Sequence, residues 1–362
     1  MTIEQAGMVT SMWSNITEVQ LDLYQLSRKS MTFSSLQHAV VMQQIKPALA
    51  PVSVAMRNDQ SGFWTTKILE SFDLKRCQQL EFFWVTMTDA VIAVCSKARP
   101  TTLIIEPYIH QYLTSNARQL VLTCGSNVVR LRLRRASQPI IDAAGRSCPL
   151  LTKLSIDEAS PGVHLEHLLR TRLQALKLSR YATRESGAFF DEFDGVLNTV
   201  STTLQHFDVS DNWFVPPCHP TCLGVDFYRG FSNLVSLRVS GLGFWCNALL
   251  VNVSIHLKLL KALWYTPLTC PNSQMSQEGA ACLGTMKHLH GVVLPSCVLP
   301  TNDSAKYLVA NAVKIIAADG YKGPYSQTLV FRGSYAHPSA LWDALYAGKR
   351  LRRPLNFPDD FM

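Results

Sequence analysis

The chain has 362 residues, of which 47% are apolar and only 17% are charged. This composition excludes wholesale disorder, which requires low hydrophobicity and high charge. The 34 basic and 26 acidic side chains give a modest net charge of +8. No apolar run reaches the roughly 18 residues of a membrane-spanning helix, and the first residues lack the basic and apolar regions of a secretory signal. We therefore expect a cytoplasmic or nuclear protein without membrane contact.

A six-residue pattern recurs along the chain: an apolar residue, two variable ones, a second apolar residue, one variable one and a third apolar residue. Its clearest copies are LESFDL (69–74), VVRLRL (128–133), LTKLSI (151–156), LQALKL (173–178), LQHFDV (204–209), LVSLRV (234–239) and LHGVVL (289–294). Weaker copies are ITEVQL (16–21), LAPVSV (49–54), PTTLII (100–105), LKALWY (260–265) and SQTLVF (326–331). The second apolar residue returns, from Val19 to Leu329, at a mean spacing of about 28 residues, within the period of leucine-rich repeats. Each copy is predicted to form one strand.

Helical segments are predicted between these strands. Residues 86–97 and 138–148 space their apolar side chains at helical intervals. A third helix is expected over 301–318, opened by the capping sequence Thr-Asn-Asp-Ser. Strand, turn, helix and turn together form the unit of the longer repeats.

Three copies extend to Asn or Cys at the ninth position, at Cys77, Asn212 and Cys297, as in the fuller leucine-rich pattern. The stretch Arg146-Ser-Cys-Pro-Leu-Leu-Thr-Lys-Leu-Ser-Ile also places a Cys-Pro pair directly ahead of a strand copy, and residues 94–100 are a looser echo of it. On these residues the chain resembles the cysteine-containing repeats of F-box/leucine-rich repeat proteins. In that family a Cys-Pro at the end of a helix precedes the next strand.

The resemblance implies an α/β leucine-rich repeat solenoid, a curved horseshoe with parallel strands on its concave face and helices on its convex face. It predicts one domain over 1–362, with about 10–12 irregular repeats over 16–331 and a C-terminal cap over 332–362. The family often carries an F-box that docks a ubiquitin-ligase adaptor. Here the strand pattern begins by residue 16 and leaves no room for an F-box. This departure from the family's pattern argues against substrate recognition for a ubiquitin ligase, which is one specific version of the implied function and would require a truncated or highly divergent F-box.

Partner-binding residues follow from the alternation of side chains along each strand, because the residues between the apolar positions face outward. Those predicted to contact a partner are Arg130, Arg132, Lys153, Lys177, Asp208, Arg238 and Trp264. The four basic residues that come first span three neighbouring strands, with Asp157 and Glu158 as a partial offset, so we expect a partner protein with an acidic surface or with phosphate groups. A merely solvated strand face is the alternative. Nucleic acid is less favoured, since the net charge is modest and no RNA-binding signature occurs.

No catalytic motif of the G-x-S-x-G, P-loop or H-E-x-x-H type occurs in the sequence. Cys218 and Cys222 flank His219, and His288 lies two residues before His290, but neither group has the four ligands that a zinc site needs. We therefore expect no catalytic residue, metal or cofactor, and a non-catalytic scaffold for protein–protein interaction. A structural subunit of a large assembly, such as a ribonucleoprotein, is the alternative, because low charge and many apolar residues also suit permanently buried faces.

Overall fold

A computed structural model describes residues 17–23, 50–106, 115–159, 172–181, 202–210, 229–240, 247–266, 276–289, 291–295 and 314–318, together with Val163, Leu165 and Leu168. The chain divides into two compact units, Met1–Arg172 and Leu173–Met362. Each unit contains its own series of parallel strands. One domain over 1–362 stays a prediction.

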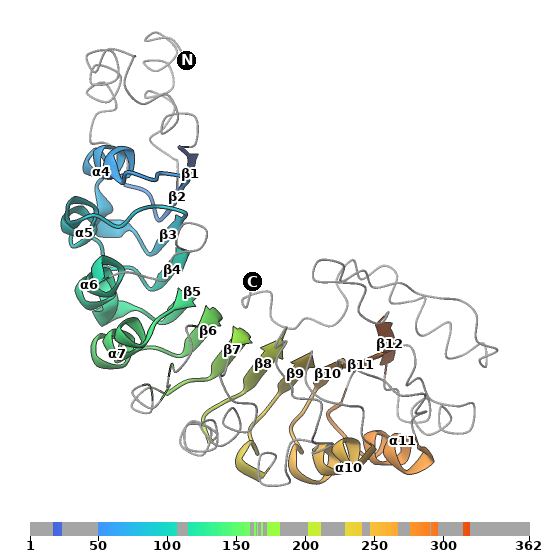
Figure 1. Cartoon of the computed structure of the whole chain (residues 1–362). Helices are drawn as coiled ribbons and strands as arrows, with labels where there is room; N and C mark the ends of the chain where they lie inside the picture. The colour runs from blue at the N-terminus through green and yellow to red at the C-terminus, as the bar shows by residue number, and fades with distance from the viewer. Residues whose placement is uncertain are drawn as a thin grey trace. The chain divides into compact units, whose positions relative to one another are not determined.

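The first unit alternates strands and helices along the chain. Its strands are β1 (Glu18–Asp22), β2 (Ser53–Arg57), β3 (Gln79–Phe83), β4 (Thr102–Glu106), β5 (Arg130–Ala136) and β6 (Lys153–Ala159). Its helices are α4 (Phe63–Glu70), α5 (Asp89–Cys95), α6 (Ser115–Cys124) and α7 (Gln138–Ser147), with the short 3-10 turns η2 (Leu74–Arg76) and η3 (Gly125–Asn127). Figure 1 shows helices α4 to α7 stacked in one column beside the strands, each helix in contact with the next.

Neighbouring strands of the first unit are parallel and in register, so equivalent residues form rows across the sheet. We number the rows from the first residue of each strand, so that Ser53 of β2 and Arg130 of β5 lie in the first row. The second row forms the centre of the core, and its members from β2 to β6 are at most 1% exposed: Val54, Leu80, Leu103, Leu131 and Leu154. The fourth row is buried as well from β2 to β6. The first, third and fifth rows face away from the core, because side chains alternate along a strand, and we call this side the strand face.

The second unit repeats the same scheme. Its strands are β7 (Ala175–Tyr181), β8 (His206–Ser210), β9 (Ser236–Ser240), β10 (Ala262–Thr266), β11 (Gly291–Pro295) and β12 (Lys314–Ala318), and its helices are α10 (Asn247–His256) and α11 (Gln277–Gly284). All neighbouring strands are again parallel. The buried second row consists of Leu176, Phe207, Leu237, Leu263 and Val292. Each of these five residues is the second apolar residue of a predicted copy, so the strand prediction is confirmed for this part of the chain.

Side-chain caps set the starts of α5 and α11. The Thr88 hydroxyl accepts a hydrogen bond from the backbone N–H of Val91 at the start of α5, and Ser276 accepts one from Gly279 at the start of α11. The helix predicted over 86–97 is therefore present as α5, with Thr88 as the capping residue that stops it from extending further toward the N-terminus.

Buried cysteines mark the helix ends of the first unit. Cys95 and Cys124 are the last residues of α5 and α6, and Cys148 is the C-cap of α7. The Cys124 thiol donates to the Cys95 carbonyl oxygen at 3.5 Å. A Cys-Pro pair at a helix end ahead of the next strand is therefore present at Cys148, as the sequence predicts.

The strand predicted at 69–74 is wrong. Leu69 lies in α4 and Leu74 begins η2. The strand of this repeat is β3, and Leu80 takes the second-row position that the pattern assigns to Phe72. Two apolar residues three positions apart also fit one turn of a helix, so the local pattern could not separate the two structures. Cys77 accordingly precedes the strand of its repeat instead of following one.

The strand predicted at 49–54 is displaced by two residues. Val54 occupies the second row, whereas Val52 is 36% exposed. A shift by two keeps the same side chains on the same face, so alternation alone does not fix this register.

The helix predicted over 301–318 is wrong at its C-terminal end, because Lys314–Ala318 forms β12 and pairs with β11. Its β-branched Ile315 and Ile316 suit a strand, and the neighbouring strand supplies hydrogen bonds that a local pattern does not record. His288 lies in an exposed turn before β11 and not in a strand. Other predictions fall outside the described residues: Asn212, Cys218, His219, Cys222, His290, Cys297, Leu329 and the cap over 332–362.

Candidate functional site

The strand face of the first unit carries three of the predicted contact residues on two neighbouring strands. Arg130 of β5 and Lys153 of β6 are register partners in the first row, and Arg132 and Ser155 are register partners in the third row. The three basic side chains are partly exposed, whereas Ser155 is only 7% exposed. The structure therefore brings Arg130, Arg132 and Lys153 together, as the alternation argument predicts.

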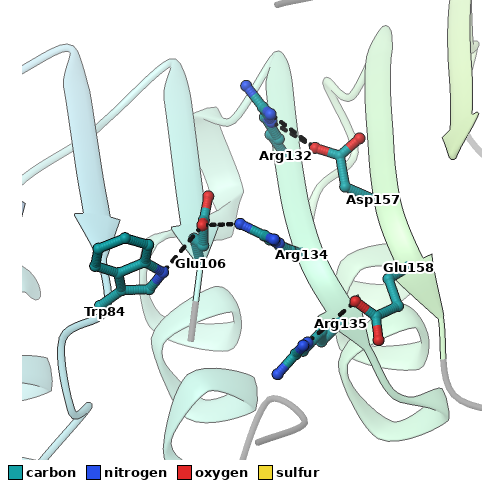
Figure 2. Close-up of polar contacts among 7 residues, drawn as sticks. All are labelled: Trp84, Glu106, Arg132, Arg134, Arg135, Asp157 and Glu158. Atoms are coloured by element: carbon teal, nitrogen blue, oxygen red, sulfur yellow. Dashed lines mark hydrogen bonds and ion pairs between the residues drawn. The ribbon is translucent and has the colours of Figure 1, made fainter. Parts of the chain in front are cut away.

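Acidic side chains neutralise part of this basic stretch (Figure 2). The Arg132 guanidinium donates to Oδ2 of Asp157 from Nε at 2.9 Å and from Nη2 at 2.8 Å. Arg135 donates from Nε to Glu158 Oε2 at 3.1 Å. The predicted offset by Asp157 and Glu158 thus consists of direct ion pairs, and these arginines are fixed by neighbours on β6.

Glu106 is the centre of a second group of polar contacts. Its Oε1 atom accepts a hydrogen bond from the Trp84 indole N–H at 3.1 Å and also forms an ion pair with Arg134. One carboxylate therefore links β3, β4 and β5, as Figure 2 shows. The Glu106 side chain is 12% exposed, and at such a site a charge needs these partners to offset the loss of hydration.

Four repeats of the first unit share one backbone conformation, just after the end of β2 and β3 and one residue before the end of β5 and β6. Asn58, Trp84, Arg135 and Glu158 have positive φ values of 62°, 59°, 56° and 74°. Each residue directly follows the fifth-row position of its strand. The left-handed conformation costs a non-glycine residue roughly 1–2 kcal/mol. Backbone bonds oppose this cost, since the N–H groups of Asn58 and Trp84 donate to the next strand at 2.9 and 2.7 Å.

The strand face of the second unit holds the other four predicted contact residues in a single row. Lys177, Asp208, Arg238 and Trp264 are successive register partners across β7 to β10. The guanidinium carbon of Arg238 lies 4.3 Å from the centre of the Trp264 ring, and its Nε lies 3.9 Å from Asp208 Oδ1. Trp264 is partly exposed and Tyr265 is 3% exposed, so the predicted outward and inward orientations are confirmed.

A polar pair lies beside this row. His206 Nδ1 and Ser236 Oγ, which are register partners in the first row, are 2.8 Å apart. The strand face of the second unit therefore places cationic, anionic, aromatic and neutral polar groups on adjacent strands, of which Asp208 and Ser236 are buried at 7% and 5% exposure. This variety suits recognition of a protein surface better than attraction to a uniform charge.

The buried thiols do not form a reactive site. Burial raises the pKa of Cys77 and of Cys148 to about 11 and that of Cys124 to about 12, and it raises the pKa of Cys95 well above its ordinary value. A protonated thiol is a weak nucleophile and a poor metal ligand. Within the described part of the chain, no three His, Cys, Asp or Glu side chains are grouped so that they could hold a metal ion.

The sequence analysis did not predict the hydrogen bond from Trp84 to Glu106. It also did not predict that Arg57 stacks on Phe83, with the guanidinium carbon 4.7 Å from the centre of the ring. These residues lie at or beyond the fifth position of their strands. The six-residue pattern ends before that position. A window longer by two residues would have included Glu106 after PTTLII (100–105), but not Arg57, Phe83 or Trp84, because the copies at 49–54 and 69–74 are displaced from β2 and β3. In the described ranges, moreover, none of the helices has the length and apolar character needed to cross a bilayer.

The repeated strands and helices, with their buried in-register rows, make the fold an α/β leucine-rich repeat solenoid. No protein-family model and no curated protein matches the sequence. Among solved structures, the chain is similar to an internalin from Listeria monocytogenes, with 12% sequence identity, a TM-score of 0.42 and coverage of 84% of this chain and 88% of that one. The fold itself follows from the strand register of this chain.

Proposed function

We propose that the chain is a non-catalytic protein-recognition module that binds a partner protein across its strand face. The observation that carries this proposal is the single row of Lys177, Asp208, Arg238 and Trp264 on consecutive strands. Tryptophan and arginine are enriched among the residues that dominate protein–protein binding energies. Because the strands hold these side chains at fixed spacing, little ordering entropy is lost on binding.

The charge pattern of this row predicts a more specific partner than a protein with a uniformly acidic surface. Lys177 and Arg238 lie on either side of Asp208 in the row, and Arg132 is already paired with Asp157. A complementary partner therefore presents acidic groups opposite Lys177 and Arg238, whereas Asp208, which is only 7% exposed and lies 3.9 Å from Arg238, is offset within the row. Such alternation gives specificity, because a shifted register would bring like charges together.

Affinity purification with the tagged full chain tests the proposal. The variant pair is Lys177→Glu and Trp264→Ala, and the control is Ile255→Ala on α10, whose side chain is 50% exposed on the helix side. Partners recovered with the wild type are purified and titrated by calorimetry. We expect at least a tenfold loss of affinity with the strand-face variants and none with the control, at unchanged circular dichroism. Equal binding by all variants would place the interface elsewhere and refute the proposal.

A role as the substrate-recognition subunit of a ubiquitin ligase is the narrower version of this proposal, and a cytoplasmic or nuclear location is part of it. It is supported by the Cys148-Pro pair at the end of α7, which resembles the F-box/leucine-rich repeat family. A titration of the full chain with the purified ligase adaptor decides it. Binding in the micromolar range or tighter would support the role, and no binding at 100-fold higher concentration would exclude it.

A subunit of a larger assembly is the second candidate, and α10 favours it. Ile255 is 50% exposed and Leu259, just beyond the helix, is 43% exposed, whereas helices of this apolar character are usually buried. Sedimentation of the purified chain separates the two candidates. A stable monomer at high concentration argues for the recognition module, and precipitation that Ile255→Ser relieves argues for the assembly subunit.

A further inference from the structure

Two neighbouring turns of the first unit, each leading from a helix to the next strand, are strongly basic. Residues 71–78 precede β3 and residues 96–101 precede β4. Their four cationic side chains are all exposed: Lys75, Arg76, Lys97 and Arg99. We call these four residues the basic edge. The backbone N–H of Thr101 donates to the Gln78 carbonyl oxygen at 2.8 Å, so the two turns lie side by side and hold the four cations on adjacent repeats.

The basic edge differs from the arginines of β5 in its partners. Arg132, Arg134 and Arg135 each form an ion pair with a carboxylate of a neighbouring repeat. Among the described residues, none of the four cations of the basic edge forms an ion pair or a side-chain hydrogen bond. Asp73 is the one acidic residue of the two turns, and its carboxylate accepts a hydrogen bond from the Lys75 backbone N–H at 3.2 Å. Four positive charges and one negative charge leave a formal net charge of +3 on this small surface.

Stabilisation of the preceding helices does not account for this charge. A cation favours the C-terminus of a helix through the macrodipole, and the effect falls off within the last turn. Helix α5 has no basic residue in its last turn, and Lys97 and Arg99 follow its last residue, Cys95, by two and four positions. Lys75 and Arg76 lie beyond the end of α4, in the short turn η2. The charge of the basic edge therefore points to a function of the surface.

We propose that the basic edge binds an extended acidic segment of a partner protein. Arginine binds a carboxylate through two parallel hydrogen bonds, and lysine adds a point charge, so glutamate and aspartate side chains suit both kinds of cation. Alternate side chains of an extended segment are about 6.6 Å apart, which lies between the spacing of adjacent repeats at their strands, about 4.8 Å, and at their helices, about 10 Å. Successive carboxylates can therefore contact successive turns. This inference does not rest on the proposed function, whose row of contact residues belongs to the second unit.

The exposed side chains of the two turns argue against a membrane or a nucleic acid as the occupant. The apolar residues of both turns are buried: Phe72, Leu74, Cys77, Ala98 and Pro100. Within these two turns, then, no apolar group is available to insert between lipids, and no exposed aromatic ring is available for a base to stack on. A contact that consists of charges alone suits an acidic polypeptide segment, and salt should weaken it by screening.

The probe is a fluorescein-labelled octapeptide of alternating glutamate and glycine, titrated into the full chain and followed by fluorescence anisotropy. The same peptide with glutamine in place of glutamate is the neutral comparison. A short single-stranded RNA and vesicles containing about one-third phosphatidylserine test the other two occupants. The site pair is Arg76→Gln with Arg99→Gln, and Asp73→Asn is a second variant. The control pair, Lys67→Gln with Arg118→Gln, removes the same charge from exposed positions on α4 and α6.

We expect the glutamate peptide to bind at least tenfold more tightly than the glutamine peptide. The site pair should lose at least fivefold in affinity, whereas the control pair should stay within twofold of the wild type. Asp73→Asn should bind at least twofold more tightly, because it removes the one carboxylate among the cations and keeps an acceptor for the Lys75 N–H. A merely structural role of these turns would not produce that gain.

Equal affinity for the two peptides, equal losses in the site and control pairs, or tighter binding of the RNA or the vesicles would each overturn the inference. The strand-face variants Lys177→Glu and Trp264→Ala should leave the affinity for the glutamate peptide within twofold of the wild type. Loss of the partner from purification with those variants concerns the proposed function alone, so the two failures can be told apart.

Discussion

Arg238 is stacked on Trp264 across the boundary between β9 and β10, with the guanidinium carbon 4.3 Å from the ring centre. The first unit contains an equivalent pair, Arg57 over Phe83, at 4.7 Å across β2 and β3. In both pairs the arginine lies one strand before the aromatic residue in the same row. Such stacking holds a cation and an aromatic ring in fixed positions on the strand face before any partner binds.

A double-mutant cycle should detect this contact. We expect Arg238→Met and Trp264→Leu to show a coupling free energy of about 0.5–1 kcal/mol in urea unfolding, because a partly exposed cation–π pair contributes that much. The cycle of Arg57→Met and Phe83→Leu provides the matched comparison in the first unit. Strictly additive effects in both cycles would show that the stacking does not stabilise the fold.

Glu106 should be important for its acceptor atom more than for its charge. Glu106→Gln keeps an oxygen for the Trp84 indole and loses only a partly exposed ion pair with Arg134, which is worth about 0.2–1 kcal/mol. Glu106→Ala also leaves the indole N–H without its acceptor, so its cost should rise to about 1–3 kcal/mol. Urea unfolding followed by tryptophan fluorescence measures both. Identical losses in the two variants would contradict this division.

The left-handed backbone at Glu158 should be measurable as strain. Glu158→Gln removes the ion pair with Arg135 but keeps φ near 74° in a residue with a side chain. Glu158→Gly removes the ion pair and the steric penalty together, so we expect it to be about 1 kcal/mol more stable than Glu158→Gln in chemical denaturation. If Glu158→Gly is the less stable of the two, then the greater freedom of glycine in the unfolded chain outweighs the relief of strain.

The buried thiols should make the first unit sensitive to alkaline pH. The pKa of Cys124 is raised from its ordinary value of 9.0 to about 12, so the folded state holds the proton more tightly than the unfolded chain does. The resulting stability is fully present below about pH 9 and is lost as the pH rises toward 12. We expect Cys124→Ala to lower stability at pH 7 and to flatten its fall between pH 9 and pH 11 in thermal unfolding. Half-buried Cys282 is the control, and an unchanged slope in Cys124→Ala would contradict the assignment.

The sequence predicted most of the strands, because a recurring spacing of apolar residues reports a buried row directly. Leu131, Leu154, Leu176 and Leu237 all occupy the second row as expected. The prediction was wrong at Phe72, where a helix turn and a strand share the same apolar spacing over a few residues. Such a local pattern does not record which neighbour supplies the hydrogen bonds.

The candidate site was predictable in part for the same reason. Alternation along the strands is enough to place Arg132 and Trp264 on the strand face. Their contacts were not predictable, since Asp157 is 25 residues from Arg132 and Glu106 is 28 residues from Arg134 in the chain. Only the register between strands brings such residues within hydrogen-bond distance.

By itself, then, the amino-acid sequence determined the repeat, the apolar rows and the side of each strand that a residue occupies. These properties depend on short-range alternation and on the free energy of burying apolar surface. The tertiary structure decided which charges are paired, which cysteines approach one another and where a buried hydroxyl such as that of Ser155 is left without a partner among the described residues. Those features depend on distances between strands that are about 20 to 30 residues apart in the chain, and such distances exist only once the repeats have packed.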